Sequence, residues 1–149
     1  MRATSTAALR STSLTLYSAL EIDTDFNVNV MTGSDGVIRG AIGGHPDTAA
    51  GASLSVVVAP LTRGRIPTIV DKVNTVVTPG SVVDVVVTDQ GLAVNPNRPE
   101  IKALLEEAGL PVTTIEALRD RCDRIVGKPE PIKYKDRIVG VVMYRDNTV

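Results

Sequence analysis

The sequence predicts a layered α/β domain with a mostly parallel or mixed sheet. Two runs rich in valine, residues 54–59 and 82–88, are typical of strands that are buried on both faces. Two later segments, residues 99–108 and 115–125, carry apolar residues at helical spacing, and such helices can cover a sheet. Because several predicted strands come before the helices, strands and helices do not alternate regularly, and we expect a mixed sheet.

The composition of the chain limits its size class and its partners. Its 149 residues correspond to about one domain, and 43% of them are hydrophobic, enough for a sizeable core. The net charge of −1 leaves no basic stripe for nucleic acid, and no apolar run reaches the roughly 20 residues that a membrane helix needs. Cys122 is the only cysteine, which excludes an internal disulfide and favours a reducing, cytoplasmic compartment.

Residues 1–13 differ in composition from the rest of the chain. They contain two arginines and many Ser and Thr residues but no acidic residue, a composition similar to that of a transit peptide. They lack an apolar stripe, so we interpret them as a disordered leader or a remnant from outside the domain. The predicted domain then comprises residues 14–149.

Extended segments and turns make up the first half of the predicted domain. Residues 14–30 are extended apart from the polar residues 23–25. Asn27 and Asn29 alternate with valines, so we expect both amides to project from one strand face. The segments that follow are a turn cluster at 32–36, a glycine-rich loop at 40–47, a helix-compatible stretch at 48–52, and short strands at 66–70 and 74–78.

Both predicted helices have start and stop signals. Pro99 suits the first position of the earlier helix, and Gly109 can end it. In the later helix, Thr113 and Glu116 fit a capping box, and Gly127 stops the helix.

The later helix has an apolar stripe, which consists of Ile115, Leu118, Cys122 and Ile125. Cys122 lies on this stripe, so we interpret it as a buried core thiol rather than a catalytic one. Residues 136–144 are expected to return to a strand, followed by a turn at 146–147.

The strongest candidate for chemistry is the loop that contains Gly43, Gly44, His45 and Asp47. Adjacent glycines let backbone amides turn toward a ligand without a Cβ in the way, and such a nest can hold a phosphate, a carboxylate or a thioester oxyanion. His45, the only histidine, could donate a hydrogen bond to the same group. Alternatively, the loop is a plain turn between strands in which Asp47 caps the following helix.

Charged residues form two further candidate groups. Glu21, Asp23 and Asp25 could bind a metal or supply a base, but no His or Cys accompanies them, so a solvated strand face is favoured and no metal site is predicted. Arg63 and Arg65 follow a strand end and could clamp a carboxylate-rich substrate or the phosphates of a carrier. Exposed surface charge is the alternative for both arginines.

Together these residues resemble one family. Long stretches of the chain closely resemble citrate lyase α subunits, and the resemblance extends from about Leu16 to Val149. These stretches are residues 18–30, 32–40, 43–45, 47–50, 59–67, 75–80, 83–89, 93–96 and 144–146.

The resemblance implies a CoA-transferase fold built of two related α/β domains, of which this chain would be the second. It implies citrate CoA-transferase activity, the exchange of acetyl for citryl on a CoA-like thioester. In this reaction Gly43, Gly44 and His45 would serve catalysis. Asn27, Asn29, Asp47, Arg63 and Arg65 would bind substrate. The glutamate that forms a covalent intermediate in many CoA-transferases has no match here, and Glu21 is not assigned that role.

The implied partners are citrate, acetyl-CoA or acetyl-acyl carrier protein, and the β and γ subunits of citrate lyase, in an oligomer. No tightly bound cofactor is expected, because the CoA-like group acts as substrate. We expect the chain alone to be inactive, because transfer needs both walls of a cleft. The alternatives are a binding or assembly module without turnover, and a related CoA-transferase or thioester hydrolase for another carboxylic acid.

Overall fold

The larger sheet of the protein has five strands in the order β1-β4-β8-β9-β10. The computed structural model describes residues 13–148, so all but Ser13 of the predicted leader lies outside the described residues. The strands are β1 (Leu14–Tyr17), β4 (Leu54–Val58), β8 (Val85–Thr88), β9 (Gly91–Val94) and β10 (Val112–Thr113). β9 runs antiparallel to β8, whereas the other three pairs are parallel. The predicted mostly parallel or mixed sheet is therefore confirmed.

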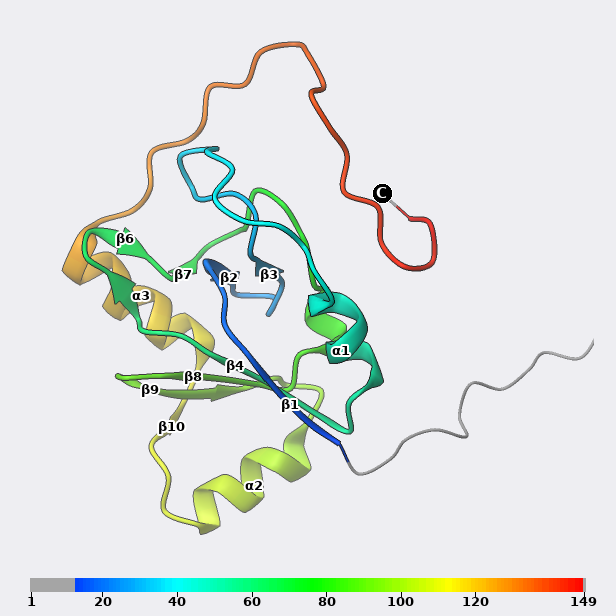
Figure 1. Ribbon diagram of the computed structural model, residues 1–149. Helices are drawn as coiled ribbons and strands as arrows, with labels where there is room; N and C mark the ends of the chain where they lie inside the picture. The colour runs from blue at the N-terminus through cyan, green and yellow to red at the C-terminus, as the bar shows by residue number, and fades with distance from the viewer. Residues whose placement is uncertain (1–12, 149) are drawn as a thin grey trace, which may run out of the picture.

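Two small sheets lie above the larger one in Figure 1. One has the order β3-β2-β7 and joins β3 (Val28–Asn29), β2 (Glu21–Asp23) and β7 (Ile69–Val70). The other is the hairpin of β5 (Thr62–Arg63) and β6 (Ile66–Pro67). Gly64 turns this hairpin with a φ of 62°, a left-handed conformation that glycine adopts without a steric penalty.

Three α-helices and one 3₁₀ turn complete the described elements. They are α1 (His45–Gly51), the turn η2 (Gly80–Val82), α2 (Pro99–Glu107) and α3 (Ile115–Val126). Both predicted later helices are confirmed. The N-cap of α3 is Thr114, whose hydroxyl accepts from the amide of Ala117 at 3.1 Å, rather than the predicted Thr113.

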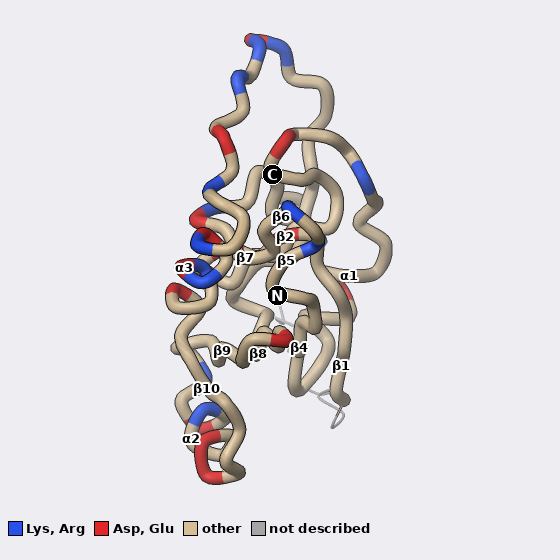
Figure 2. Tube along the Cα trace, turned by 90° about the vertical axis from the view of Figure 1, so that its left-hand side faces the viewer, with Lys and Arg blue, Asp and Glu red and all other residues tan. Residues whose placement is uncertain are grey.

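The strands β4, β8 and β9 are largely buried on both faces, which explains the continuous valine runs, whereas Leu14 and Leu16 of the edge strand β1 are exposed. Val57, Val86 and Ala93 face the small sheets and α3, and Val56, Val85 and Val94 on the opposite face belong to the cluster with α2. Figure 1 shows α2 below the sheet and α3 beside the small sheets. In Figure 2 the charged residues gather on the outer sides of these two helices and along the segment after α3.

Two predicted strands do not form. Residues 74–78 contribute only a single bridge between Thr78 and Val28. Residues 136–144 have strand-forming side chains, but no strand of residues 13–148 pairs with them, and they remain without regular structure. Among the helices that the structure describes, none is both long enough and apolar enough to cross a membrane.

Cys122 tests the packing of α3. Its side chain has 0% exposure, its Sγ donates to the carbonyl oxygen of Leu61 at 3.2 Å, and burial raises the pKa of the thiol. We expect Cys122→Ala to lower the free energy of unfolding by about 1–2 kcal/mol because buried volume is lost. Ile125 is 58% exposed on the same helix, so Ile125→Ala should cost less. Denaturant titration checks both values, and rapid thiol labelling of the native chain would contradict the buried assignment.

Candidate functional site

Ser18 is the point at which two of the predicted site residues meet. It follows β1 directly, and its side chain is exposed. His45 Nε2 lies 2.8 Å from the carbonyl oxygen of Ser18, and Arg63 Nη2 donates to the Ser18 hydroxyl at 3.3 Å. The first residue of α1 and the β5 strand therefore approach the carboxyl end of β1 from two sides, the end at which open α/β sheets bind ligands.

The hydrogen bonds of His45 define the state of its ring. A carbonyl oxygen can only accept, so Nε2 carries the proton and donates to Ser18. Burial lowers the pKa of His45, so the ring is neutral at pH 7 and Nδ1 accepts from the hydroxyl of the buried Thr78 at 2.9 Å. Both ring nitrogens are engaged, which makes His45 a residue that holds Ser18 in place rather than a free base.

Tyr17 fixes the other side of the imidazole. The two rings meet edge to face with centroids 4.2 Å apart. The Tyr17 hydroxyl lies 2.6 Å from the hydroxyl of the buried Ser55, and burial raises the pKa of Tyr17 to about 12. Tyr17 is therefore neutral throughout the physiological range and acts as a packed support for His45.

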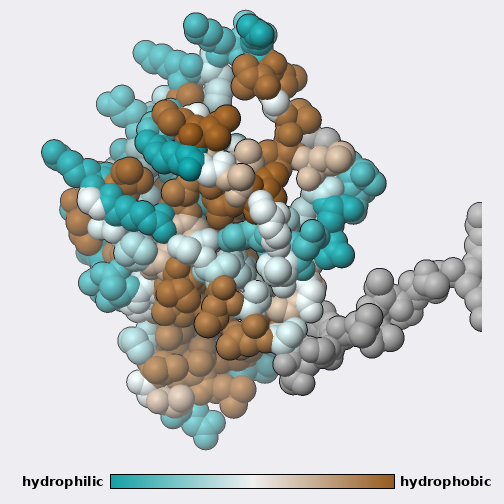
Figure 3. Space-filling view, viewed as in Figure 1, coloured by the Kyte–Doolittle hydropathy of each residue, from teal (hydrophilic) through white to brown (hydrophobic). Residues whose placement is uncertain are grey.

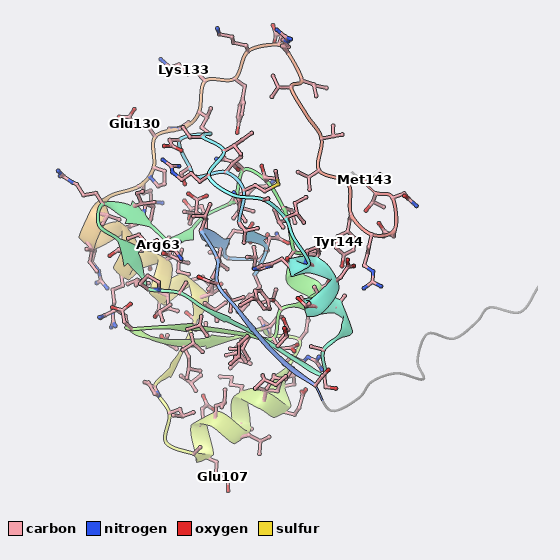
Figure 4. The ribbon with its side chains drawn as sticks, in the orientation of Figure 1. Arg63, Glu107, Glu130, Lys133, Met143 and Tyr144 are labelled. Atoms are coloured by element: carbon pink, nitrogen blue, oxygen red, sulfur yellow. The ribbon has the colours of Figure 1, made fainter. Side chains whose placement is uncertain are left out.

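Arg63 is a cation without an acidic neighbour. Its Nη1 donates to the carbonyl oxygen of Leu20 at 3.2 Å, in addition to the bond to Ser18. Within residues 13–148, neither Arg63 nor Arg65 lies within ion-pair distance of an acidic side chain. Figure 4 shows Arg63 close to the upper end of β1. The guanidinium is held in position, and its charge remains available to an anion.

Gly43 and Gly44 directly precede His45 and are exposed. Gly43 has a φ of 55°, which strains any residue with a Cβ, whereas Gly44 has a φ of −87° and is the N-cap of α1. Asp47 lies in the first turn of α1 rather than at its cap, with its side chain 67% exposed and 3.7 Å from Arg145. The loop leaves its backbone open to solvent next to His45.

Asn27 and Asn29 do not project from one strand face, because β3 contains only Val28–Asn29. The Asn27 amide binds Asp23 and accepts from the amide of Gly80 at 2.9 Å. Asn29 has 0% exposure, and its amide is bonded to Thr32 and Met31. Both side chains organise backbone in this structure and do not meet Arg63 or His45.

Arg65 also lies apart from Ser18. It lines a separate cavity of about 430 Å³, together with Ser34, Arg39 and residues of the segment after α3 that include Glu130 and Lys133. Figure 4 shows Glu130 and Lys133 on that segment, above α3. The two predicted arginines therefore lie at different places, and only Arg63 contacts Ser18, which also contacts His45.

The predicted solvated face of acidic residues is wrong for Glu21 and Asp23, which are each 1% exposed, whereas Asp25 is exposed as predicted. Asp23 accepts from the amides of Asp25, Asn27 and Val73, which closes the turn after β2. Oε1 of Glu21 accepts from the amide and hydroxyl of Ser34 at 2.5 Å each, and burial raises the pKa of this carboxyl. No group of three or more possible metal-binding side chains occurs among the described residues.

Comparison with known proteins identifies the family. The model of the citrate lyase α subunit family matches residues 2–149, including the segment that we interpret as a leader. The chain belongs to the citrate lyase α subunit family. It is 62% identical over 134 residues to the citrate lyase α chain of Escherichia coli, a match that covers 90% of this chain and 26% of that one. The α chain of Klebsiella pneumoniae is 58% identical over 143 residues, or 96% of this chain and 28% of that one.

Solved structures agree with this family assignment. The citrate lyase α subunit of Streptococcus mutans in complex with citrate matches with a TM-score of 0.88 and 59% identity, over 91% of this chain and 27% of that chain. A Pseudomonas malonate decarboxylase matches with a TM-score of 0.51 and 16% identity, over 81% of this chain and 34% of that chain, which shows a shared fold alone. The chain spans about a quarter of the length of its citrate lyase relatives.

The sequence does not reveal the three residues that contact His45, which are Ser18, Tyr17 and Thr78. Ser18 and Thr78 lie 27 and 33 residues from His45, so no local spacing connects them. The signal that could have drawn attention to Ser18 is its place directly after an apolar strand, where site residues of open sheets gather.

The pKa of His45 can be measured directly in this member of the citrate lyase α subunit family, because His45 is the only histidine. Burial lowers this pKa, so we expect NMR titration of the imidazole to give a value below 6.5. The unfolded chain then binds the proton first, and this group's contribution to stability is present above pH 6.5 and lost as the pH falls toward the folded-state pKa. The difference in unfolding free energy between wild type and His45→Gln should therefore shrink from pH 7 to pH 5. A pKa above 6.5 would contradict the buried, neutral ring.

Proposed function

We propose that this chain forms part of a citrate CoA-transferase in the citrate lyase complex, which exchanges acetyl for citryl on a CoA-like thioester. The observation that carries the proposal is Arg63, a positioned guanidinium without an acidic partner beside an exposed strand end. Family membership and the citrate bound to the Streptococcus mutans relative support citrate as the anion.

The proposed reaction has two steps that balance without a cofactor. A carboxylate of citrate attacks the acetyl carbonyl of the thioester, and the carrier leaves as a thiolate, so that a mixed anhydride of citrate and acetate forms. The thiolate then attacks the citryl carbonyl, releasing acetate and giving the citryl thioester. Each attack places negative charge on a carbonyl oxygen, which backbone donors at the exposed Gly43–Gly44 loop are suited to stabilise.

The roles of the remaining residues follow from their bonds. Arg63 has donors beyond those used by Ser18 and Leu20, so it can hold a carboxylate of citrate while remaining fixed. His45 positions Ser18 and the start of α1 rather than transferring a proton. Arg65, which lines its own cavity, is proposed to serve the carrier phosphate rather than citrate.

The proposed partners are acetyl-CoA or acetyl-acyl carrier protein and the β and γ subunits of citrate lyase. The whole activity needs more of the α chain than these residues, because relatives are about four times as long. We propose that the 149-residue chain alone does not catalyse the reaction. The roles of its residues are therefore tested in a full-length citrate lyase α chain that carries residues 13–148 of this sequence, called the long chain.

Arg63 gives the decisive test of citrate binding. In the long chain, Arg63→Ala should raise the KM for citrate about tenfold or more, because a hydrogen bond to a charged group is worth about 1.5–3 kcal/mol. Arg65→Ala is the matched control, removing an equal charge at a separate cavity, and should leave the citrate KM unchanged. Steady-state assays with varied citrate measure both values. An unchanged citrate KM for Arg63→Ala, with the protein folded, rules out the anion-binding role.

Gly44 tests the close approach of the thioester. A Cβ at Gly44 would meet only Thr48 Cγ2 at 3.9 Å, an ordinary contact, so Gly44→Val should barely change the melting temperature. It should nevertheless lower kcat in the long chain, because the side chain covers the exposed backbone. Gly43→Ala is the contrasting variant, since its φ of 55° should cost about 1 kcal/mol of stability. Full activity of a folded Gly44→Val protein would exclude contact between this loop and the reacting group.

A further inference from the structure

The segment after α3 stands away from the rest of the protein. Residues 127–148 contain no regular secondary structure, and in Figure 1 they arch over the small sheets and return beside α1. Ion pairs lie at both ends of the arch. Lys128 lies 3.0 Å from Asp71 at its start, and Arg145 lies 3.7 Å from Asp47 on α1 at its end.

Space remains beneath the arch. A cavity of about 520 Å³ separates residues 134–142 from the body, whose side of the cavity includes Met31, Ile38 and Thr75. Figure 3 shows hydrophobic side chains around this opening and along the arch. The described residues leave the outward-facing side chains of this segment exposed.

The side chains of residues 141–144 alternate in the manner of a strand, whereas Ile138 and Val139 are neighbours that are both exposed, at 83% and 89%. Val141 and Met143 are 66% and 61% exposed. Between and after them, Val142 and Tyr144 are half-buried. Side chains with a period of two residues, one set outward and the other inward, are what a β-strand presents to two surfaces.

The backbone of this segment lacks the pairing that its sequence favours. Among residues 136–143, the backbone hydrogen bond that forms is local, from the amide of Arg137 to the carbonyl oxygen of Lys135. β-Branched residues favour strands, and an apolar strand with open main-chain groups is a template for another strand. The segment ends at a tight turn in which the amide of Tyr144 donates to the carbonyl oxygen of Thr148 at 2.8 Å.

We infer that residues 136–144 are an interaction strand that pairs with a β-strand from the part of the citrate lyase α chain outside these 149 residues. A polypeptide strand satisfies both features of the segment, because it supplies main-chain partners and covers the outward valines. The relatives provide the source, since roughly three quarters of their length lies outside the match. This inference rests on family membership and is independent of the proposed reaction and of the role of Arg63.

Amide hydrogen exchange tests the pairing. In the 149-residue chain the amides of residues 138–143 should exchange at nearly unprotected rates, whereas in the long chain alternate amides should be slowed on the order of 100-fold or more. Unprotected amides in the long chain would overturn the inference. Protection in the 149-residue chain that appears together with dimerisation would overturn it in favour of a second copy as the partner.

A pair of variants separates packing from charge. Val141→Asp buries a carboxylate if a strand covers it, so it should lower the Tm of the long chain by several degrees. The same change should leave the Tm of the 149-residue chain within about 1 °C, because Val141 is exposed there. Lys135→Asp, at an exposed position just before the strand, is the control and should alter neither. Equal Tm values for Val141→Asp and Lys135→Asp in the long chain would contradict the inference.

Discussion

The buried carboxylate of Asp84 connects the layers on which the site is built. Its Oδ2 accepts from the amide of Ser55 in β4 at 2.8 Å, and its Oδ1 accepts from Nε of Arg98, the N-cap of α2, at 2.6 Å. Its backbone also binds Ser55 and Asn95. Because Asp84 is only 3% exposed, losing one partner would leave a buried charge, and that penalty exceeds the value of a surface ion pair. β4, the entry to β8, the exit of β9 and the start of α2 are therefore held in one arrangement.

Two hydroxyl groups connect Asp84 and its partner Ser55 to the candidate site. Ser55 meets the Tyr17 hydroxyl at 2.6 Å, and the Tyr17 ring packs edge to face on His45. The chain of contacts ends with a neutral imidazole on one side of Ser18 and a cationic guanidinium on the other. In the proposed reaction this asymmetry would orient the substrate, with the carboxylates of citrate on the side of Arg63 and the reacting carbonyl at the open glycine loop.

The sequence predicts those parts of the fold that local pattern determines. Buried strands appear as valine runs, and α2 and α3 appear because apolar spacing coincides with Pro99 and Gly127 at their ends. Burial of Glu21 could not be predicted, since alternating acids look the same on a wet face and its partner Ser34 is 13 residues away. The site was found only in part for the same reason. His45 could be singled out as the only histidine, and Arg63 because it is a cation that follows a strand end. Ser18 and Thr78 acquire their roles through contacts with residues that are distant in the sequence.

In the arch, the local preference for a strand is not realised in the structure. Residues 136–144 have the side chains of a strand, yet a strand needs a neighbour, and none of the described strands reaches them. Their end is nevertheless tied to the site, because Arg145 faces Asp47 two residues after His45. An exposed ion pair of this kind contributes at most about 1 kcal/mol, so it cannot by itself hold the arch against α1. A paired strand would bury apolar side chains on the same segment, and each fully buried valine contributes roughly 1.5 kcal/mol or more. If residues 136–144 pair as inferred, the burial of these side chains would contribute more to holding the arch than the ion pair with Asp47 does.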